Sequence, residues 1–343
     1  MACNCVCVLN SRTGRLRYIG KQGPGIRRLR AGRGFQYLVA KGTRIKNPKT
    51  LSRIRSLAIP PAWKDVWICP DELGHLQATG RDAKGRKQYR YHPRFRSRRD
   101  ETKFARLIDF ARRLPLLRRR IQRDLRSPTL DGNKVLAVVT RLLETTCIRV
   151  GNTEYAKQNG SFGLTTLRDK HARTQGSRLT LCFPGKSGIA HQVEIDDPRL
   201  AKAVRRCRDL PGYELFQYVD ETGTHRKVDS SMVNDYLRET MGDEFTAKDF
   251  RTWQGTLEAA IVMSAIPRPK TETAMQKAIS GAIRDVAERL GNRPATCRKF
   301  YIHPAIVDAF EKGSLPLNLK RSTRTVPSRG LSKVERTVIK LLR

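Results

Sequence analysis

Long apolar runs are missing from this sequence of 343 residues. No stretch reaches the about 18 consecutive apolar residues that a membrane-spanning helix needs, so no membrane segment is expected. The N-terminal segment is too short and too polar to resemble a signal peptide. A cytoplasmic protein is therefore expected.

Acidic residues are scarce, and this shortage has the larger consequence. The sequence holds 32 Asp and Glu residues against 69 Lys and Arg residues, which gives a formal net charge of +37. Such a charge predicts a polyanionic partner, most simply nucleic acid. A ribosomal-type protein or a solvated basic surface would show the same excess, so charge alone leaves these alternatives open.

Complete metal-binding motifs are also missing. Of the eight cysteines, only Cys3, Cys5 and Cys7 lie close together. Their spacing could suit a soft metal, but no second Cys or His pair completes a zinc site, so reduced thiols in a frayed terminus are the favoured interpretation. The six histidines show no metal-ligand spacing. We therefore predict no metal and no small-molecule cofactor.

Hydrophobic patterning predicts an α+β protein with a flexible terminus at 1–20 and a small β-rich N-terminal domain at 21–97. After this the period becomes helical, which predicts a larger, mainly helical domain at 98–313 and a basic C-terminal tail at 314–343. Pro115 is expected to interrupt the first long helix. Shorter elements are expected as a Gly/Arg loop at 23–34, a strand at 35–39, a helix at 47–57, a hairpin from 66–69 and 75–79, a strand at 164–167, and a hairpin from 178–183 and 191–195.

The last part of the N-terminal domain, with the first residues after it (81–99), is basic and carries aromatic residues between its charges. In an extended segment Gln88 and Arg90 would share one face, and Tyr89 and Tyr91 the other. This arrangement favours phosphate contacts combined with polar or stacking contacts to bases. A plain basic linker is the alternative, although it gives the interleaved aromatics no role.

One tyrosine, Tyr301, stands out by its position. It comes about two turns after a helix start marked by Asn292 and Pro294. Arg298 and Lys299 lie close before it, so its hydroxyl is expected in a positive field. Taken alone, the pattern favours a half-buried tyrosine on an amphipathic helix.

Three cationic residues change that balance. Arg149 closes an apolar helix, Lys186 sits between glycines at a hairpin tip, and Arg251 lies one turn into a helix that 246–249 would cap. Each has a plain alternative: a buried ion pair for Arg149, a solvated turn for Lys186 and a surface charge for Arg251. Together with Tyr301 they suit chemistry at a phosphodiester.

A phosphodiester under attack develops charge on its two non-bridging oxygens. An arginine fork donates two hydrogen bonds to such oxygens and stays charged. Tyrosine is a suitable nucleophile when the energy of the broken bond must be kept in a covalent intermediate. A lysine can protonate the 5′ oxygen, a poor leaving group, and general acid catalysis of this kind contributes roughly 10²–10⁴-fold.

Five segments, in order along the chain, resemble the poxvirus-like type IB DNA topoisomerases, particularly their bacterial branch. The resemblance runs from about residue 26 to residue 310. It implies a monomer whose two domains clamp double-stranded DNA, and which relaxes supercoils through a 3′-phosphotyrosyl intermediate, strand rotation and religation, without ATP or metal. The segments are GRDAKGRKQYRYHPRFR (80–96), IRVGNTEYAKQNGSFGLTTLRDKH (148–171), FPGKSG (183–188), TAKDFRTWQGT (246–256) and LGNRPATCRKFYIHP (290–304).

The resemblance also implies roles for single residues. Tyr301 matches the nucleophile, while Arg149 and Arg251 match the arginines that hold the non-bridging oxygens. Lys186 matches the general acid for the 5′ hydroxyl. Poxvirus members have a histidine where this sequence has Asn292, so this position can donate a hydrogen bond but cannot titrate. Contacts to DNA are implied for Lys87, Gln88, Tyr89, Tyr91, Asn152, Tyr155 and Thr166.

Two alternatives to this favoured reading stay open at this level. A tyrosine site-specific recombinase shares the nucleophile chemistry, but such enzymes usually carry a His-x-x-Arg box, and here Lys248 precedes Arg251 at that spacing. A non-enzymatic DNA-packaging protein explains the charge but not the candidate residues. The favoured hypothesis is a bacterial topoisomerase that acts in the cytoplasm and associates with the nucleoid.

Overall fold

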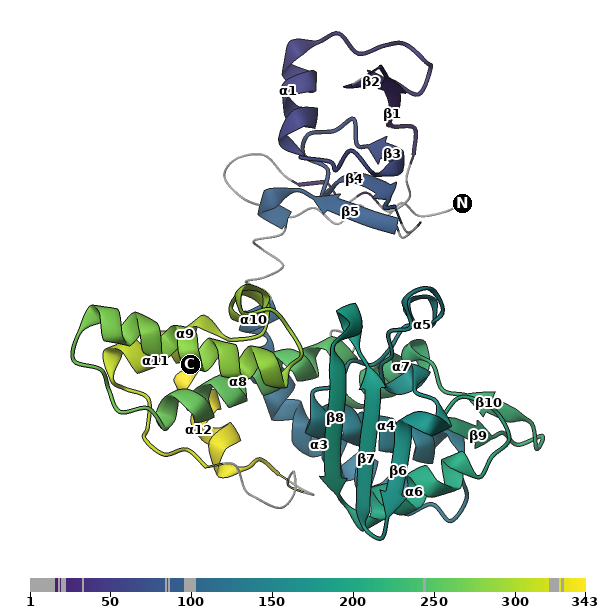
Figure 1. Ribbon diagram of the computed structural model, residues 1–343, viewed down its shortest axis with the longest axis vertical. Coiled ribbons are helices and arrows are strands. Elements are labelled where there is room, and N and C mark those ends of the chain that lie inside the picture. Colours follow the sequence, from purple (N-terminus) through teal and green to yellow (C-terminus); the bar gives the residue numbers. More distant parts are fainter. Residues whose placement is uncertain are drawn as a thin grey trace. The chain divides into compact units, whose positions relative to one another are not determined.

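The computed structural model describes residues 16–17, 19, 23–32, 34–83, 85, 87–95, 103–242, 245–320, 327 and 330–343. The chain divides into two compact units, Met1–Lys103 and Phe104–Arg343, called the N-terminal unit and the C-terminal unit below. Strands dominate the first and helices the second (Figure 1). The predicted α+β class is thereby confirmed. The cysteine cluster Cys3, Cys5 and Cys7 lies outside the described residues.

The N-terminal unit is an antiparallel sheet with one helix beside it. Its strand order is β2-β1-β3-β4-β5, and its small core includes Ile54 of the helix and Ile68 of the central strand. The predicted short helix and the predicted hairpin are both present, the latter as β3 and β4. The elements are β1 (Ile26–Ala31), β2 (Gly34–Leu38), α1 (Pro48–Ser56), β3 (Lys64–Ile68), β4 (Leu76–Arg81) and β5 (Lys87–Tyr91).

The Gly/Arg loop predicted at 23–34 is wrong, because strand β1 occupies half of it. Ile26 and Arg28 are buried, whereas Arg27 between them is exposed. Arg28 donates hydrogen bonds to the carbonyl oxygens of Pro60 at 3.1 Å and Trp63 at 2.7 Å. A run that reads as uniformly basic is therefore an alternating strand in which one arginine replaces an apolar residue.

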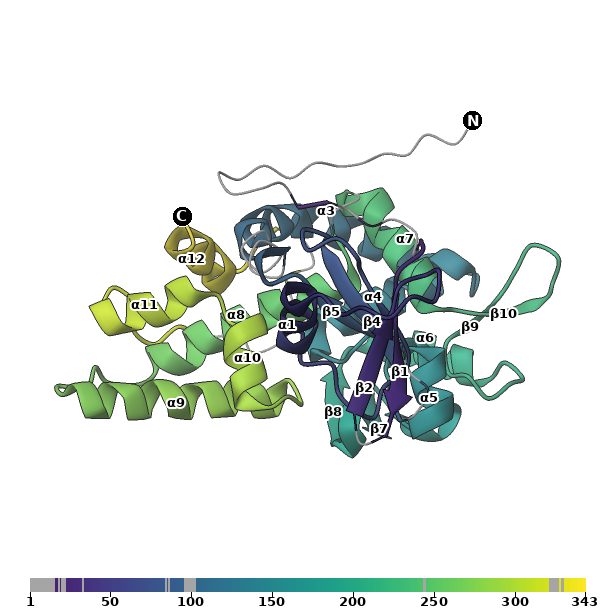
Figure 2. The same ribbon diagram turned by 90° about the horizontal axis from the view of Figure 1, so that it is seen from above.

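The C-terminal unit combines a helical layer, a three-stranded sheet of order β6-β7-β8 and a group of later helices. Both views place α9, α11 and α12 at one end of this unit and β9 and β10 at the other (Figure 1, Figure 2). The elements are α3 (Leu107–Leu125), α4 (Gly132–Thr146), α5 (Thr153–Asn159), β6 (Ala172–Gln175), β7 (Arg178–Pro184), β8 (Ala190–Asp196), α6 (Pro198–Arg208), β9 (Gln217–Val219), β10 (His225–Lys227), α7 (Ser230–Met241), α8 (Ala247–Ser264), α9 (Glu272–Arg289), α10 (Pro294–Phe300), α11 (Pro304–Lys312) and α12 (Lys333–Leu341).

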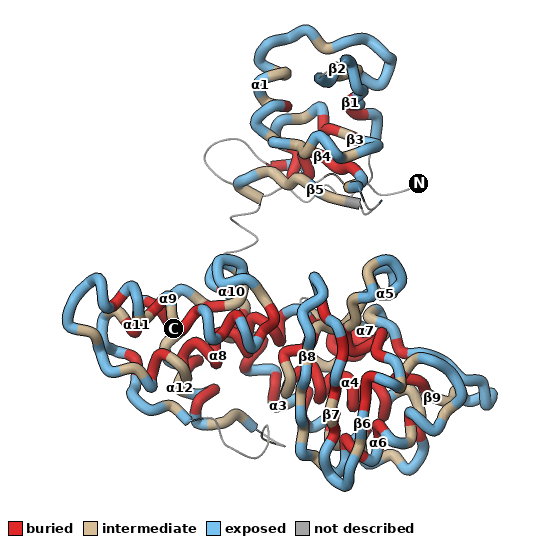
Figure 3. Tube along the Cα trace, in the orientation of Figure 1, coloured by how far each residue is buried: buried red, intermediate tan, exposed pale blue. Residues whose placement is uncertain are grey.

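Helices α4 and α8 form the centre of this unit. Figure 3 shows buried residues along both of them, and every residue from Lys134 to Glu144 in α4 is buried. Helix α4 begins where the Asp131 carboxylate accepts from the Lys134 amide at 2.9 Å, and it ends at Cys147, whose φ of 58° is left-handed. The chain therefore turns sharply just before Arg149.

Two local predictions are wrong for reasons of packing. Pro115 does not interrupt α3, because a continuous buried face that includes Leu114 and Leu117 outweighs the about 3 kcal/mol that an interior proline costs. Residues 164–167 form no strand: Leu164–Thr166 is a short 3-10 helix, in which the Thr166 amide donates to the Gly163 carbonyl at 2.9 Å.

The stretch predicted as a basic tail contains helix α12, which packs into the core of the C-terminal unit. Val338 is fully buried in the same core cluster as α3 and α8. Glu335 accepts from the Arg118 guanidinium at 2.5 Å, and Arg118 also donates to Glu144 of α4 at 2.7 Å. The buried Arg118 guanidinium, together with the hydrogen bonds of Ser332, holds the pKa of Glu335 below its usual value despite burial.

Among the described helices, none combines the length and the apolar character that a bilayer crossing requires. No group of three or more His, Cys, Asp and Glu residues in the described part of the chain has an arrangement that could hold a metal ion.

Candidate active site

Arg251 lies in the first turns of α8, where the sequence fixes the helix start. The Thr246 amide and hydroxyl donate to the Asp249 carboxylate at 2.9 and 3.0 Å, which is the predicted capping box. The Arg251 side chain is turned inward, with only 4% of the residue exposed, so the alternative of a surface charge is wrong. Its guanidinium donates to the carbonyl oxygen of Leu290 at 2.6 Å and to that of Cys147. Arg251 thus joins the end of α4 to the end of α9.

Arg149 meets the turn between α9 and α10. It donates to the side-chain oxygen of Asn292 at 2.6 Å and to the carbonyl oxygen of Gly291 at 3.3 Å. Burial and the nearby positive charge of Arg251 lower the Arg149 pKa to about 10. Its partners are neutral oxygens, so the alternative of a buried ion pair is wrong.

The two guanidiniums concentrate positive charge that no carboxylate in the described part of the chain compensates. No carboxylate among the described residues pairs with Arg149 or Arg251. Two donors are also left over, since Nε of Arg251 and Nδ2 of Asn292 are buried without a hydrogen-bond partner in the described part of the chain. Buried donors normally find partners, and like charges repel, so this arrangement favours binding of an anion with several oxygens.

Tyr301 lies next to this positive cluster. Helix α10 ends at Tyr301, whose amide donates to the Cys297 carbonyl at 2.9 Å. The side chain is half-buried, and the centroid of its ring lies 5.2 Å from Cζ of Arg251. The geometry therefore unites four predicted residues, namely Arg149, Arg251, Asn292 and Tyr301, from segments far apart in sequence.

The main chain of Tyr301 packs directly against α8. A Cβ built on Gly255 would lie 2.5 Å from the Tyr301 carbonyl oxygen, so only glycine allows this approach. The Thr256 hydroxyl donates to the same oxygen at 3.3 Å and accepts from the His303 amide at 3.1 Å. Because Gly255 and Thr256 follow Arg251 on α8, one helix positions both the arginine and the tyrosine.

Lys186 lies at the tip of the β7–β8 hairpin, as predicted. A short 3-10 turn, Lys186–Gly188, connects the strands, and Ser187 within it has a left-handed φ of 65°. Lys186 is exposed, and its ammonium has no hydrogen-bond or ion-pair partner among the described residues. The hairpin thus presents an unengaged ammonium group, but the structure does not place that group against Tyr301.

His191 of β8 was not predicted, yet it lies beside these residues. Burial lowers its pKa, and the charges of Arg149 and Arg251 lower it further, so the imidazole is neutral at neutral pH. Its only signal in the sequence is a position shortly after Lys186 in the same hairpin. A single histidine without a spaced partner gives no basis for a prediction.

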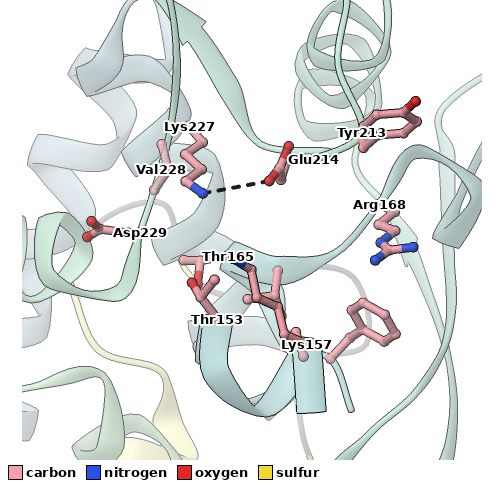
Figure 4. Close-up of a pocket in the computed structure, with 12 residues that line it drawn as sticks. Thr153, Lys157, Thr165, Arg168, Tyr213, Glu214, Lys227, Val228 and Asp229 are labelled. Atoms are coloured by element: carbon pink, nitrogen blue, oxygen red, sulfur yellow. Dashed lines mark ion pairs between the residues drawn. The ribbon is translucent and has the colours of Figure 1, made fainter. Parts of the chain in front are cut away.

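Three predicted DNA contacts lie in or near α5, and one of them, Thr166, lines a surface pocket. Asn152 caps this helix by accepting from the Tyr155 amide at 3.0 Å, and Tyr155 is 40% exposed. The Thr166 hydroxyl is buried. It accepts a hydrogen bond from the Gly163 amide and donates one to the Gly163 carbonyl, each at 3.0 Å, so both bonds stabilise the local turn. The pocket has a volume of about 350 Å³, and Thr166 contributes to its lining. Figure 4 shows Lys157, Arg168 and Lys227 around it, with Lys227 paired to Glu214 at 3.8 Å.

The remaining predicted DNA contacts belong to β5 of the N-terminal unit. The rings of Tyr89 and Tyr91 stack with centroids 6.0 Å apart on one face, and Tyr89 is 46% exposed. The Gln88 amide donates to Asp82 at 2.9 Å, and Arg90 donates to the Ala58 carbonyl at 2.8 Å. The predicted alternation of the strand is confirmed, and Lys87 opens the same strand.

Comparisons with known proteins find matches to both parts of the chain. Residues 92–320 match the family described as the catalytic core of eukaryotic DNA topoisomerase I, and residues 34–82 match the N-terminal domain of bacterial DNA topoisomerase IB. The chain is 35% identical over 285 residues to DNA topoisomerase 1B of Acanthamoeba polyphaga mimivirus, which spans 81% of this chain and 85% of that protein. It is 25% identical over 265 residues to DNA topoisomerase 1B of vaccinia virus (strain Copenhagen), which spans 74% and 80%.

Proposed function

The chain belongs to the type IB DNA topoisomerases, a family of isomerases that act on DNA, and from this premise we propose that Tyr301 is its nucleophile. In this proposal the enzyme relaxes supercoiled duplex DNA by cutting one strand, letting it rotate and resealing it. ATP is not required, because the bond energy is kept in a 3′-phosphotyrosyl link. A metal is not required, because Arg149 and Arg251 supply the positive charge at the phosphate. Membership in this family removes the support for a recombinase or a packaging protein.

The observation that carries the proposal is the uncompensated positive cluster beside Tyr301. A scissile phosphodiester would bring the missing negative charge to Arg149 and Arg251. Its non-bridging oxygens would also supply acceptors for Nε of Arg251 and Nδ2 of Asn292, which are buried without partners among the described residues. These donors are fixed in the protein before reaction, which is the condition for strong stabilisation of the charge that develops in the transition state.

The proposed reaction uses these residues in sequence. The phenol of Tyr301 gives its proton to water, and its oxygen bonds to phosphorus while Arg149 and Arg251 hold the non-bridging oxygens. The bond between phosphorus and the 5′ oxygen breaks, and the Lys186 ammonium protonates that oxygen. After strand rotation the 5′ hydroxyl attacks the phosphotyrosine, which restores the DNA and releases Tyr301.

The N-terminal and C-terminal units are proposed to close as a clamp on duplex DNA. Exposed Tyr89 on β5 and exposed Tyr155 on α5 support this, since each unit then offers an aromatic group for DNA contact. We also propose a monomeric bacterial enzyme of the cytoplasm that associates with the nucleoid. The match of residues 34–82 to a bacterial domain supports a bacterial source.

The proposed function is tested by relaxation of a negatively supercoiled plasmid in EDTA without ATP. We expect full relaxation, together with a covalent protein–DNA adduct that carries the label when a duplex labelled at the 5′ end of the cut strand is denatured during reaction. The label lies on the fragment whose 3′ phosphate would be bonded to Tyr301. A matched reaction with magnesium and ATP should give the same products. A requirement for either addition would contradict the proposal, and so would an adduct formed through the 5′ phosphate of the fragment downstream of the cut.

Replacing Gly255 with alanine should slow DNA cleavage without unfolding the protein. The new methyl group would meet the Tyr301 carbonyl oxygen at 2.5 Å, so the tyrosine must shift. A displacement of about 1 Å at a reacting group can cost about 100-fold in rate, and we expect a loss of this size in single-turnover cleavage.

The matched control for this substitution is Gly281→Ala on α9. A Cβ there meets nothing within 4 Å, so it should stabilise the protein by about 0.5–1 kcal/mol through helix propensity and leave cleavage unchanged. Wild-type cleavage by Gly255→Ala would show that the contact does not set the position of Tyr301.

A further inference from the structure

The imidazole of His191 packs against two glycines, each of which immediately precedes a candidate catalytic residue. A Cβ built on Gly185 would lie 2.4 Å from Cδ2 of His191, and one built on Gly291 would lie 2.7 Å from Cε1. Gly185 is followed by Lys186 and Gly291 by Asn292. One ring therefore contacts the main chain of both the hairpin tip and the turn that carries Asn292.

The ring of His191 is itself held in place. It stacks on Phe183, its partner across the β7–β8 pair, with centroids 5.2 Å apart and planes inclined by 15°. Phe183 is buried in the main core of the C-terminal unit. The contacts with the two glycines thus come from a ring that is anchored to that core.

The hairpin tip has few other restraints in the described part of the chain. The Gly185 amide donates to the Ile189 carbonyl at 2.7 Å, which closes the turn on itself, and Ile189 is 41% exposed. Strand β8 is the edge of its sheet. Since a lysine ammonium sits on a flexible four-carbon stem, the position of the turn decides where the ammonium of Lys186 can reach.

We propose that His191 is a positioning residue, which fixes the hairpin tip against the Gly291–Asn292 turn so that Lys186 reaches the 5′ oxygen of the bound phosphodiester. The inference rests on the proposed function and adds a residue that acts through Lys186 instead of touching DNA. In this arrangement Arg149 and Asn292 bind the phosphate at the Gly291–Asn292 turn, and the hairpin tip positions the general acid, Lys186. His191 sets the distance between them.

A DNA substrate with sulfur in place of the bridging 5′ oxygen tests this inference. When Tyr301 attacks such a substrate, the phosphorus–sulfur bond breaks and the sulfur leaves with the electron pair as a thiolate, which needs no proton. With ordinary DNA, His191→Ala should lower the single-turnover cleavage rate by about 10- to 100-fold. With the sulfur substrate, the same variant should cleave close to the wild-type rate.

The controls separate this inference from the proposed function. Lys186→Ala should lose more rate than His191→Ala on ordinary DNA and recover it with sulfur, whereas Gln192→Ala, an exposed neighbour on β8, should behave as wild type on both substrates. If Lys186→Ala recovers but His191→Ala loses the same factor on both substrates, the positioning role is wrong. If neither variant recovers, the acid role of Lys186 fails, and the inference fails with it.

A pair of glycine variants tests the contact itself. Gly185→Ala should be defective in the wild-type background, because its methyl group meets the His191 ring. The same change should add little further loss in His191→Ala, where the ring is absent. Independent losses in the double variant would overturn the proposed packing role.

Discussion

Tyr301→Phe should abolish both plasmid relaxation and the covalent adduct while leaving DNA binding unchanged. The substitution removes only the oxygen that would bond to phosphorus and keeps the ring that lies 5.2 Å from Cζ of Arg251. Loss of a covalent nucleophile in other enzymes costs on the order of 10⁶-fold, which would leave no detectable relaxation. The measurement combines gel relaxation with a binding titration at one fixed salt concentration, since salt strongly changes DNA affinity.

The matched variant for this experiment is Tyr218→Phe on β9, at the opposite end of the C-terminal unit from α9, α11 and α12 (Figure 1). It also loses one phenolic oxygen, and it should relax DNA as the wild type does. An adduct that persists in Tyr301→Phe at the wild-type rate would place the nucleophile elsewhere in the chain.

Arg251→Ala should lower the cleavage rate by about 10²–10³-fold, the usual cost of losing one preorganised donor to developing charge. It should also destabilise the fold, because the carbonyl oxygens of Cys147 and Leu290 lose their donor. Each buried group left without a partner costs about 1–3 kcal/mol. Single-turnover cleavage and thermal unfolding measure the two effects separately.

Arg251→Lys distinguishes charge from geometry at the same position. The lysine keeps the positive charge but has no counterpart of the Nε donor, which is buried without a partner in the described residues. We therefore expect most of the rate loss to remain with a smaller loss of stability. Arg284→Ala, an exposed arginine on α9, is the control for removing one positive charge. If Arg251→Lys cleaved DNA at the wild-type rate, the forked guanidinium of Arg251 would not contribute to cleavage.

Features whose cause is local were predictable from the sequence. The capping box at Thr246, the hairpin tip around Lys186 and the helix that ends at Tyr301 all depend on residues a few positions apart. The apolar helix expected before Arg149 is also present, as α4. Each of these local structures forms as predicted because no long-range contact favours a different conformation there.

Features decided by tertiary packing were not predictable. Arg28 read as part of an exposed basic loop, and a surface charge was the plain alternative for Arg251. Both guanidiniums instead donate to carbonyl oxygens of distant segments in the interior. Pro115 reads as a helix break, but the buried face of α3 continues through it. His191 gave no signal because its role depends on two glycines that the fold brings to it, one of them in a segment far along the chain.

The convergence of the candidate site itself came from family resemblance and not from the residue pattern. No pattern in the sequence near Arg149 indicates that Asn292 accepts its hydrogen bond, which has a length of 2.6 Å. The hydrogen bond between Arg149 and Asn292 forms only when three features are in place together: the left-handed end of α4, the path of α8 and the turn after α9. Single-sequence reasoning could name the residue types that suit a phosphodiester, but not show that they meet.

The buried pairing of Arg118 with Glu144 and Glu335 has a consequence for how the enzyme is made. Helix α12 leaves the ribosome after every other element of the C-terminal unit, and until then the core lacks Glu335 and the apolar face around Val338. The unit can therefore complete its folding only after α12 has been synthesised. A nascent chain that already carries Tyr301 would still be incompletely folded, so unfinished copies of the enzyme should be poor at cutting DNA.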